Sequence, residues 1–135
     1  MYSRQHGLAK LTTLVVIAAI LGVLAAAVML MPKGFKDDLS VIGQGSVVVV
    51  LVHDKHLVGG TKMMELLNKI RPDYEGKVEF LAVDVATPIG QSFVRQQQVD
   101  VIDLVVFGVD GSRQELIKAG VSEQQLRSVL DNAVR

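Results

Sequence analysis

Two histidines and an aspartate lie within a stretch of four residues, at His53, Asp54 and His56. Imidazole and carboxylate groups together bind Zn²⁺ and similar ions, so this stretch is a candidate metal site. Successive side chains at the end of a strand point to alternate faces, however, and all three would reach one ion only if the loop bent back. We therefore predict that these residues solvate a loop, and that the protein binds no metal and no cofactor.

The composition argues against several other kinds of chemistry. The chain has no cysteine, so it can form no disulfide, no thiolate nucleophile and no Zn–thiolate site. Thr61 offers a hydroxyl but has no identifiable general base beside it. We expect Thr61 instead to cap a helix that follows a turn at Gly59 and Gly60. The formal net charge is zero at pH 7, which argues against a protein built to neutralise nucleic-acid phosphates.

A long apolar segment lies near the N-terminus. From Leu11 to Met31 the chain carries no charged residue, and about 20 apolar residues are enough to cross a bilayer. A cleaved signal peptide is the alternative, but its apolar core usually has only about 7–15 residues. We therefore predict an uncleaved transmembrane signal anchor over residues 11–31, after an N-terminal tail of residues 1–10.

The charges beside this segment indicate its orientation. Arg4 and Lys10 precede it without any acidic residue, whereas Lys33 and Lys36 follow it together with two aspartates. The counts of Lys and Arg are tied, because the positive-inside rule ignores acids. The uncompensated amino end favours a cytoplasmic N-terminus. We therefore expect a single-pass protein of the inner (cytoplasmic) membrane, with its C-terminal domain facing the periplasm or the cell exterior.

After a linker of residues 32–38, the pattern is that of one domain over residues 39–135. Continuous apolar runs predict buried strands, and helical spacing between them predicts helices. The Asp110-Gly111 pair predicts a hairpin turn, and Ser122 with Gln125 predicts a capping box. In order, the expected elements are a short helix in 35–45, a strand at 46–53, a helix at 61–71, a strand at 77–85, a helix at 87–98, two strands within 103–119 and a helix from 122.

This order of elements predicts the topology. The first two strands are joined through a helix, so they should be parallel with a right-handed crossover. The last two strands should form an antiparallel hairpin. The sequence therefore predicts an α/β fold with a four-stranded mixed sheet flanked by helices, preceded by one transmembrane helix.

Several segments of this domain resemble the thioredoxin family. "KMMELLNKI", "YEGKVEFLAVDV", "VDVIDLVVFGVDG" and "AGVSEQQLRSVL" follow one another as in that family, and Lys62-Met63 matches the pair that opens its first long helix. The resemblance places the four active-site positions on Val58, Gly59, Gly60 and Thr61. Val58 and Thr61 then stand where the family has its two cysteines. Other family positions are also replaced: the tryptophan by Leu57, the buried acid by Val52 and the cis-proline by Asp103.

The resemblance implies a member of the family that has kept its scaffold and lost its redox chemistry, because thiol–disulfide exchange needs a thiolate. The leading hypothesis is therefore not an enzyme but a membrane-anchored, redox-inactive thioredoxin-like domain. It would act as a protein-interaction or structural subunit of an envelope membrane complex, with other membrane or envelope proteins as partners. In the family this surface meets extended polypeptide, so we expect partner contacts at Leu57, Val58, Ile102 and Asp103.

Asp103 carries a more specific expectation. Unlike a proline it keeps its N–H, so its backbone can donate as well as accept a hydrogen bond. Its carboxylate would favour a basic or amide-rich segment of the partner.

Two alternatives to this hypothesis remain open. One is a metal-binding or enzymatic site at His53, His56 and Asp103. The other is a thioredoxin-like chaperone or assembly factor for secretion or pilus machinery, which composition does not separate from the leading hypothesis.

Overall fold

The computed structural model describes residues 2–31 and 34–135. They form two compact units, which divide after residue 33. Met1, in the expected tail, and Pro32 and Lys33, in the expected linker, lie outside the described residues.

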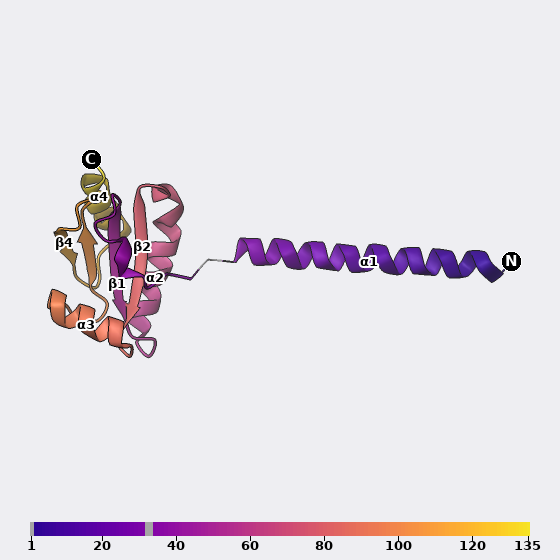
Figure 1. Ribbon diagram of the computed structural model, residues 1–135, viewed down its shortest axis with the longest axis horizontal. Helices are drawn as coiled ribbons and strands as arrows, with labels where there is room; N and C mark the ends of the chain where they lie inside the picture. The colour runs from indigo at the N-terminus through magenta and orange to yellow at the C-terminus, as the bar shows by residue number, and fades with distance from the viewer. Residues whose placement is uncertain (1, 32–33) are drawn as a thin grey trace. The chain divides into compact units, whose positions relative to one another are not determined.

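The first unit is a single helix, α1 (Tyr2–Leu30) (Figure 1). Its stretch Gly7–Leu30 has 24 residues, and an 18-residue part of it has a mean hydropathy of 2.8 and is not buried in the structure. By length and composition, this helix is able to cross a bilayer. Residues 2–10 of the expected tail are helical and continuous with the apolar segment, since α1 begins at Tyr2.

The second unit is built on a four-stranded mixed sheet, as predicted. Its strands are β1 (Val47–His53), β2 (Val78–Asp84), β3 (Leu104–Phe107) and β4 (Arg113–Ile117), in the order β2-β1-β3-β4. β1 pairs in parallel with β2, from Val47 opposite Val78 to His53 opposite Asp84, and antiparallel with β3. β3 and β4 form the predicted hairpin. β1 is central and almost wholly buried, because strands pair with both of its edges and helices cover both faces of the sheet.

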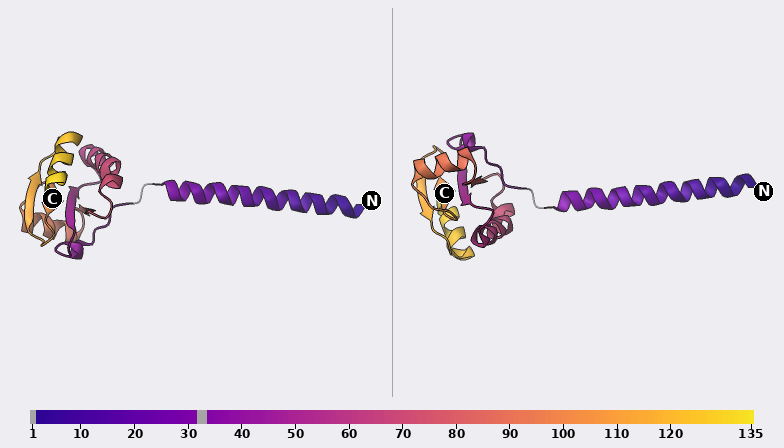
Figure 2. Two further views of the ribbon diagram at one scale, coloured as in Figure 1. Left: turned by 90° about the horizontal axis from the view of Figure 1, so that it is seen from above. Right: turned by 90° about the horizontal axis from the view of Figure 1, so that it is seen from below.

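Helices cover both faces of the sheet (Figure 2). α2 (Val58–Ile70) and α4 (Glu123–Ala133) pack on one face, and the short 3-10 helix η2 (Arg71–Tyr74) follows α2. α3 (Pro88–Gln97) and the 3-10 helix η1 (Leu39–Val41) pack on the other. Because side chains alternate along a strand, β1 contributes to both apolar cores: Val47, Val49 and Leu51 to the first, and Val48, Val50 and Val52 to the second.

The short helix expected at 35–45 is confirmed only in part, as the 3-10 helix η1. Only η1 is helical, and Lys36 lies extended beside β2, where its carbonyl oxygen accepts the N–H of Ala82 at 3.0 Å. Gly43 and Gly45 have φ values of 82° and 98°, in the left-handed region that glycine adopts readily and a helix does not. The segment therefore covers part of the outer edge of β2 and then turns into β1.

The start of α2 also differs from the prediction. α2 begins three residues earlier, so Gly59 and Gly60 lie in its first turn and Thr61 is not its cap. The N-cap position belongs to Leu57, whose side chain makes no capping hydrogen bond. The chain turns before the glycines, where the carbonyl oxygen of Asp54 accepts the N–H of Leu57 at 2.9 Å. A glycine pair permits a turn without requiring one, and here both residues are helical.

Other predicted boundaries are confirmed. Thr87 caps α3, because its hydroxyl accepts the N–H of Gly90 at 3.1 Å. Ser122 and Gln125 form the predicted capping box at the start of α4. Gly111 has a φ of 85° in the hairpin turn, the conformation for which glycine is favoured.

Candidate functional site

The candidate site lies where β1 ends and α2 begins. The N–H of Ile102 donates to the carbonyl oxygen of Val52 at 2.7 Å, and the N–H of Val52 donates to that of Asp103 at 3.0 Å. These hydrogen bonds continue the pairing of β1 with β3 beyond the ends of the strands. They bring the two segments that the sequence analysis singled out, 53–61 and 102–103, to the same end of the sheet.

Ile102 is held in an unusual backbone conformation. Its φ is 75°, and a left-handed backbone is an outlier for a β-branched residue. Its half-buried side chain packs against the first turn of α2: a Cβ added at Gly59 would lie 2.6 Å from Cδ1 of Ile102. Strained backbone of this kind persists where the surrounding structure imposes it, and it clusters at functional sites.

Asp103 is buried, with 2% of its surface exposed. Its carboxylate accepts hydrogen bonds from Nζ of Lys118 and from the N–H of Asp100, both at 2.9 Å. Its own N–H donates to the carbonyl oxygen of Asp100 at 3.2 Å. The hydrogen bond from Lys118 to Asp103 raises the pKa of that lysine.

These contacts correct the expectation for Asp103. Its N–H, its carbonyl oxygen and its carboxylate all have partners inside the domain, so none of them is available to a basic partner segment. The reason is energetic, since a buried charge needs a partner and hydrogen bonds. Asp103 fixes the segment before β3, a position where the family places a cis-proline; no peptide bond between described residues is cis.

The histidines and Asp54 form a turn. Oδ1 of Asp54 accepts the backbone N–H of His56 at 2.9 Å, and the carbonyl oxygen of His53 accepts the N–H of Val85 at 3.0 Å. Among the described residues, no group of three or more His, Cys, Asp and Glu is placed to hold a metal ion. The alternative of a metal or enzymatic site at His53, His56 and Asp103 also loses its carboxylate, because Asp103 is already paired.

Two apolar side chains are exposed at this end of the sheet. Leu57 has 44% of its surface exposed and Val58 has 72%, although both belong to residue types that are usually buried. Lys55 and Lys62 are exposed on either side of them in the sequence. The site is therefore an apolar pair with basic neighbours.

Comparisons with known proteins agree with this architecture. No model of a known protein family matches the sequence, and no curated protein does. The structure matches the solution structure of a thioredoxin from Thermus thermophilus with a TM-score of 0.64 and 18% identity, over 76% of this chain and 87% of that chain. The fold is thioredoxin-like. A second match, the structure of a malarial protein, has a TM-score of 0.58 and 16% identity, over 67% of this chain and 99% of that chain.

At these identities the likeness shows the fold, and the predicted resemblance is confirmed at that level. The thioredoxin-like domain has no thiol, so its own side chains cannot carry out thiol–disulfide exchange. The strand, loop and helix that would present the redox residues are nevertheless all formed. Val58, Gly59, Gly60 and Thr61, to which the sequence resemblance assigns the degenerate active site, make up the first turn of α2.

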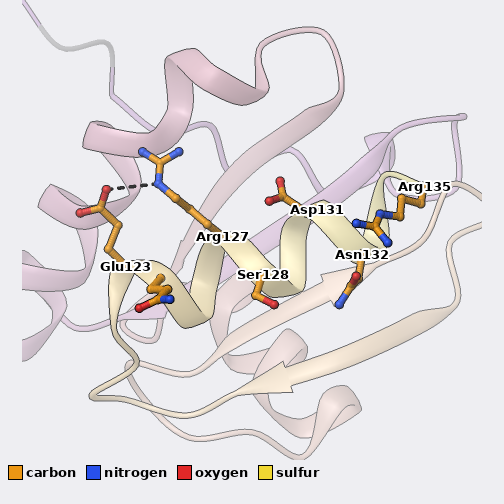
Figure 3. A pocket seen from close by; sticks show the side chains of 7 residues that line it. Glu123, Arg127, Ser128, Asp131, Asn132 and Arg135 are labelled. Atoms are coloured by element: carbon orange, nitrogen blue, oxygen red, sulfur yellow. Dashed lines mark hydrogen bonds and ion pairs between the residues drawn. The ribbon is translucent and has the colours of Figure 1, made fainter.

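Two shallow hollows of the thioredoxin-like domain are lined by other residues, and neither was predicted. One, of about 560 Å³, lies over α4 (Figure 3) and is lined by Glu123, Gln124, Arg127, Ser128, Asp131, Asn132 and Arg135. The other, of about 610 Å³, lies beside η1 and α3 and is lined by Asp37, Asp38, Leu39, Pro88, Ile89, Ser92, Phe93 and Gln96.

The hollow over α4 borders a set of polar contacts that hold this helix in place. Glu123 pairs with Lys69 of α2 at 2.7 Å and with Arg127 at 3.1 Å. The buried hydroxyl of Tyr74 donates to Asp131 at 2.7 Å, and burial together with this bond raises the pKa of Tyr74 to about 12. Lys69 and Glu123, and likewise Tyr74 and Asp131, are more than 50 residues apart in the sequence. No local sequence pattern therefore predicted these contacts.

Proposed function

We propose that this chain is a membrane-anchored, redox-inactive thioredoxin-like domain that acts as a protein-interaction or structural subunit of an envelope membrane complex. In this proposal α1 is a single-pass anchor in the inner membrane, and the domain faces the periplasm or the cell exterior. Three observations support it: an apolar helix of spanning length, a thioredoxin-like fold, and a chain without cysteine.

The observation that carries the proposal is the exposed pair Leu57 and Val58. By the resemblance, these residues stand where thioredoxins have a tryptophan and the first cysteine, on the surface that meets polypeptide substrates. Single exposed apolar residues are common on proteins. Here two consecutive ones directly precede Gly59, which packs against Ile102, a residue with a strained backbone. A partner that covered them would gain the free energy of burying apolar surface without any covalent bond.

The test is a paired substitution, Leu57→Ser with Val58→Ser, in the full chain solubilised from membranes in mild detergent. Serine removes the apolar surface without adding charge. At the N-cap position it can also supply the capping hydrogen bond that Leu57 lacks, which compensates for lost packing. We therefore expect the domain's melting temperature to change little.

Recovery of a stoichiometric membrane partner should fall sharply with this variant. Truncating residues at the centre of an interface costs about 2 kcal/mol or more, which weakens binding by roughly thirtyfold. The matched control is Ile89→Ser with Val109→Ser, which removes two other exposed apolar side chains, 47% and 55% exposed. If the complex survives the first pair, or is lost equally with the control, the surface at Leu57 and Val58 is not the contact.

A further inference from the structure

We infer that the surface made by Leu57, Val58 and Ile102, with Lys55 and Lys62 beside it, binds an acidic segment of the partner. The segment is extended polypeptide in which carboxylates flank an apolar side chain. We call this surface the entry surface, because it lies where the chain enters α2. The inference rests on the proposed function and specifies the chemistry of the partner, in the opposite sense to the basic segment that the sequence suggested.

Three acidic groups in the segments that meet at the entry surface have contacts inside the domain. Asp103 is buried and bound by Lys118. Asp54 is half-buried and accepts the N–H of His56. Asp100 is exposed and lies 3.5 Å from the same Lys118. Each of these three carboxylates therefore already has a partner inside the domain.

The lysines of the entry surface, Lys55 and Lys62, take part in none of the ion pairs between described residues. Lys36 and Lys77 do not either, whereas Lys69 and Lys118 form ion pairs at 2.7 Å and 2.9 Å. Lys62 lies four residues after Val58 on α2, so the two side chains share one face of the helix. Glu65, the next exposed acid on α2, lies three residues after Lys62 and further from the N-terminal end than either lysine. In the sequence the apolar pair is thus flanked by two lysines that are outside the ion pairs of the described residues.

The start of α2 adds to this positive potential. α3 and α4 begin with capping hydrogen bonds from Thr87 and Ser122, but α2 has neither a side-chain cap nor an acidic residue in its first turn. The N–H groups of Val58 and Gly59 make no hydrogen bond to any other described residue. The N-terminus of a helix carries about half a positive charge, which favours an anion brought from outside.

A polypeptide occupant fits these features together. An extended chain that carries an apolar side chain between two carboxylates matches this surface. Its apolar side chain would contact Leu57 and Val58, and its carboxylates would meet the two lysines and the backbone N–H donors. An anionic lipid headgroup could bind the lysines and the N–H groups. It has no apolar group beside its charge that would contact Leu57 and Val58 at the same time. We therefore assign the surface to peptide, and the experiment includes lipid as a competing outcome.

The probes are three synthetic peptides with blocked ends and a central leucine, flanked on each side by two glutamates, two glutamines or two lysines. Each is titrated into the isotope-labelled full chain in an uncharged detergent and followed by NMR. We expect the glutamate peptide to shift the amide signals of Lys55, Val58 and Gly59. Its dissociation constant should be at least about tenfold lower than that of the lysine peptide, and should rise between about 50 and 300 mM salt as charges are screened.

Variants separate the charges from the fold. Lys55→Glu and Lys62→Glu should each lower the affinity for the glutamate peptide by about threefold, and together by about tenfold, as expected for the loss of exposed ion pairs. Lys77→Glu, at an exposed lysine outside the entry surface, should change nothing. If the double charge reversal does not fold, the neutral pair Lys55→Gln with Lys62→Gln gives the same test with a smaller effect.

The inference is overturned if the glutamate peptide fails to shift these amides at millimolar concentration, or if the lysine peptide binds as well. It also fails if the same amides shift only when the full chain is moved from neutral to phosphatidylglycerol-containing nanodiscs. Partner recovery then distinguishes the two proposals. If Leu57→Ser with Val58→Ser releases the partner but Lys55→Glu with Lys62→Glu does not, the surface is the contact and its partner is not acidic. If neither variant releases it, both proposals are wrong.

Discussion

Replacing Gly90 by alanine tests how tightly α3 is seated against the sheet. Gly90 is buried in the first turn of α3. A Cβ at this position would lie 1.9 Å from the carbonyl oxygen of Asp84 and 2.5 Å from its carbonyl carbon, whereas real Cβ contacts essentially never fall below 3.0 Å. The obstructing atoms belong to the backbone at the end of β2, so no side-chain rotation relieves the clash.

The size of the effect follows from this geometry. The first turn of α3 and the end of β2 must separate by roughly 1 Å, and overpacking of buried sites costs about 1–3 kcal/mol or more. Alanine recovers up to about 1 kcal/mol, because it is the better helix former. We expect a net loss of about 2 kcal/mol, which lowers the melting temperature of a domain of this size by on the order of 10 °C.

Two glycines in the first turn of α2 are matched controls. At Gly60 the nearest atoms to a new Cβ are Cβ of His53 at 3.6 Å and the carbonyl oxygen of Asp54 at 3.7 Å. Gly60→Ala should therefore gain stability from the higher helix propensity of alanine and raise the melting temperature by a few degrees. At Gly59 the obstruction is the mobile end of Ile102, and a distorted rotamer costs about 0.5–1.5 kcal/mol. That cost is close to the helix gain, so Gly59→Ala should melt near the unmodified protein.

The assay is thermal unfolding of the full chain in detergent, followed by circular dichroism on the four proteins in parallel. The expected order of melting temperatures is Gly60→Ala, then Gly59→Ala, then Gly90→Ala well below both. A Gly90→Ala protein that melts within about 2 °C of the unmodified chain would show that α3 can move away from β2 at little cost. The packing argument would then be refuted.

Three further predictions follow from individual side chains and from α1. Absorbance titration should show a tyrosine with a pKa of about 12 that Tyr74→Phe removes; the raised pKa contributes stability that is present below about pH 10 and is lost as pH rises to about 12. The ion pairs with Lys69 and then Arg127 lower the pKa of Glu123 below its ordinary 4.5. Glu123→Gln should therefore melt below the unmodified protein at pH 7, and converge with it as acid protonates Glu123. The protein should stay in membranes after alkaline extraction with residues 1–31 present; an intact mass beginning near Val28 would show a cleaved signal instead.

The strands and most caps were predictable because their signals are local. The run of β1 is apolar at successive positions, which only a strand covered on both faces requires. Thr87 and Ser122 each lie one residue before a helix that they cap through their own side chains. In these cases the residues that determine the structure are sequence neighbours, so one stretch of sequence contains the whole interaction.

The start of α2 and the role of Asp103 were not predictable, because both depend on contacts between distant residues. Asp103 is paired with Lys118, 15 residues later, and only the register of the β3–β4 hairpin brings the two together. Gly59 reads locally as part of a turn, but its lack of a side chain makes room for Ile102, from a segment more than 40 residues away. A sequence shows that a residue is polar or small, and the fold determines what it faces.

The same long-range contacts bear on whether the entry surface is a binding surface or only the remains of a redox site. The N–H of Val52 donates to the carbonyl oxygen of Asp103, and the carbonyl oxygen of Val52 accepts the N–H of Ile102. The carboxylate of Asp103 also binds Lys118, which follows β4, and Ile102 packs against Gly59. Together these contacts fix the segment beside Leu57 in one conformation, at the cost of a strained backbone at Ile102. A partner held without a covalent bond gains affinity when the surface it meets is already ordered, because less conformational entropy is lost on binding. An ordered segment of this kind is what the proposed noncovalent binding requires.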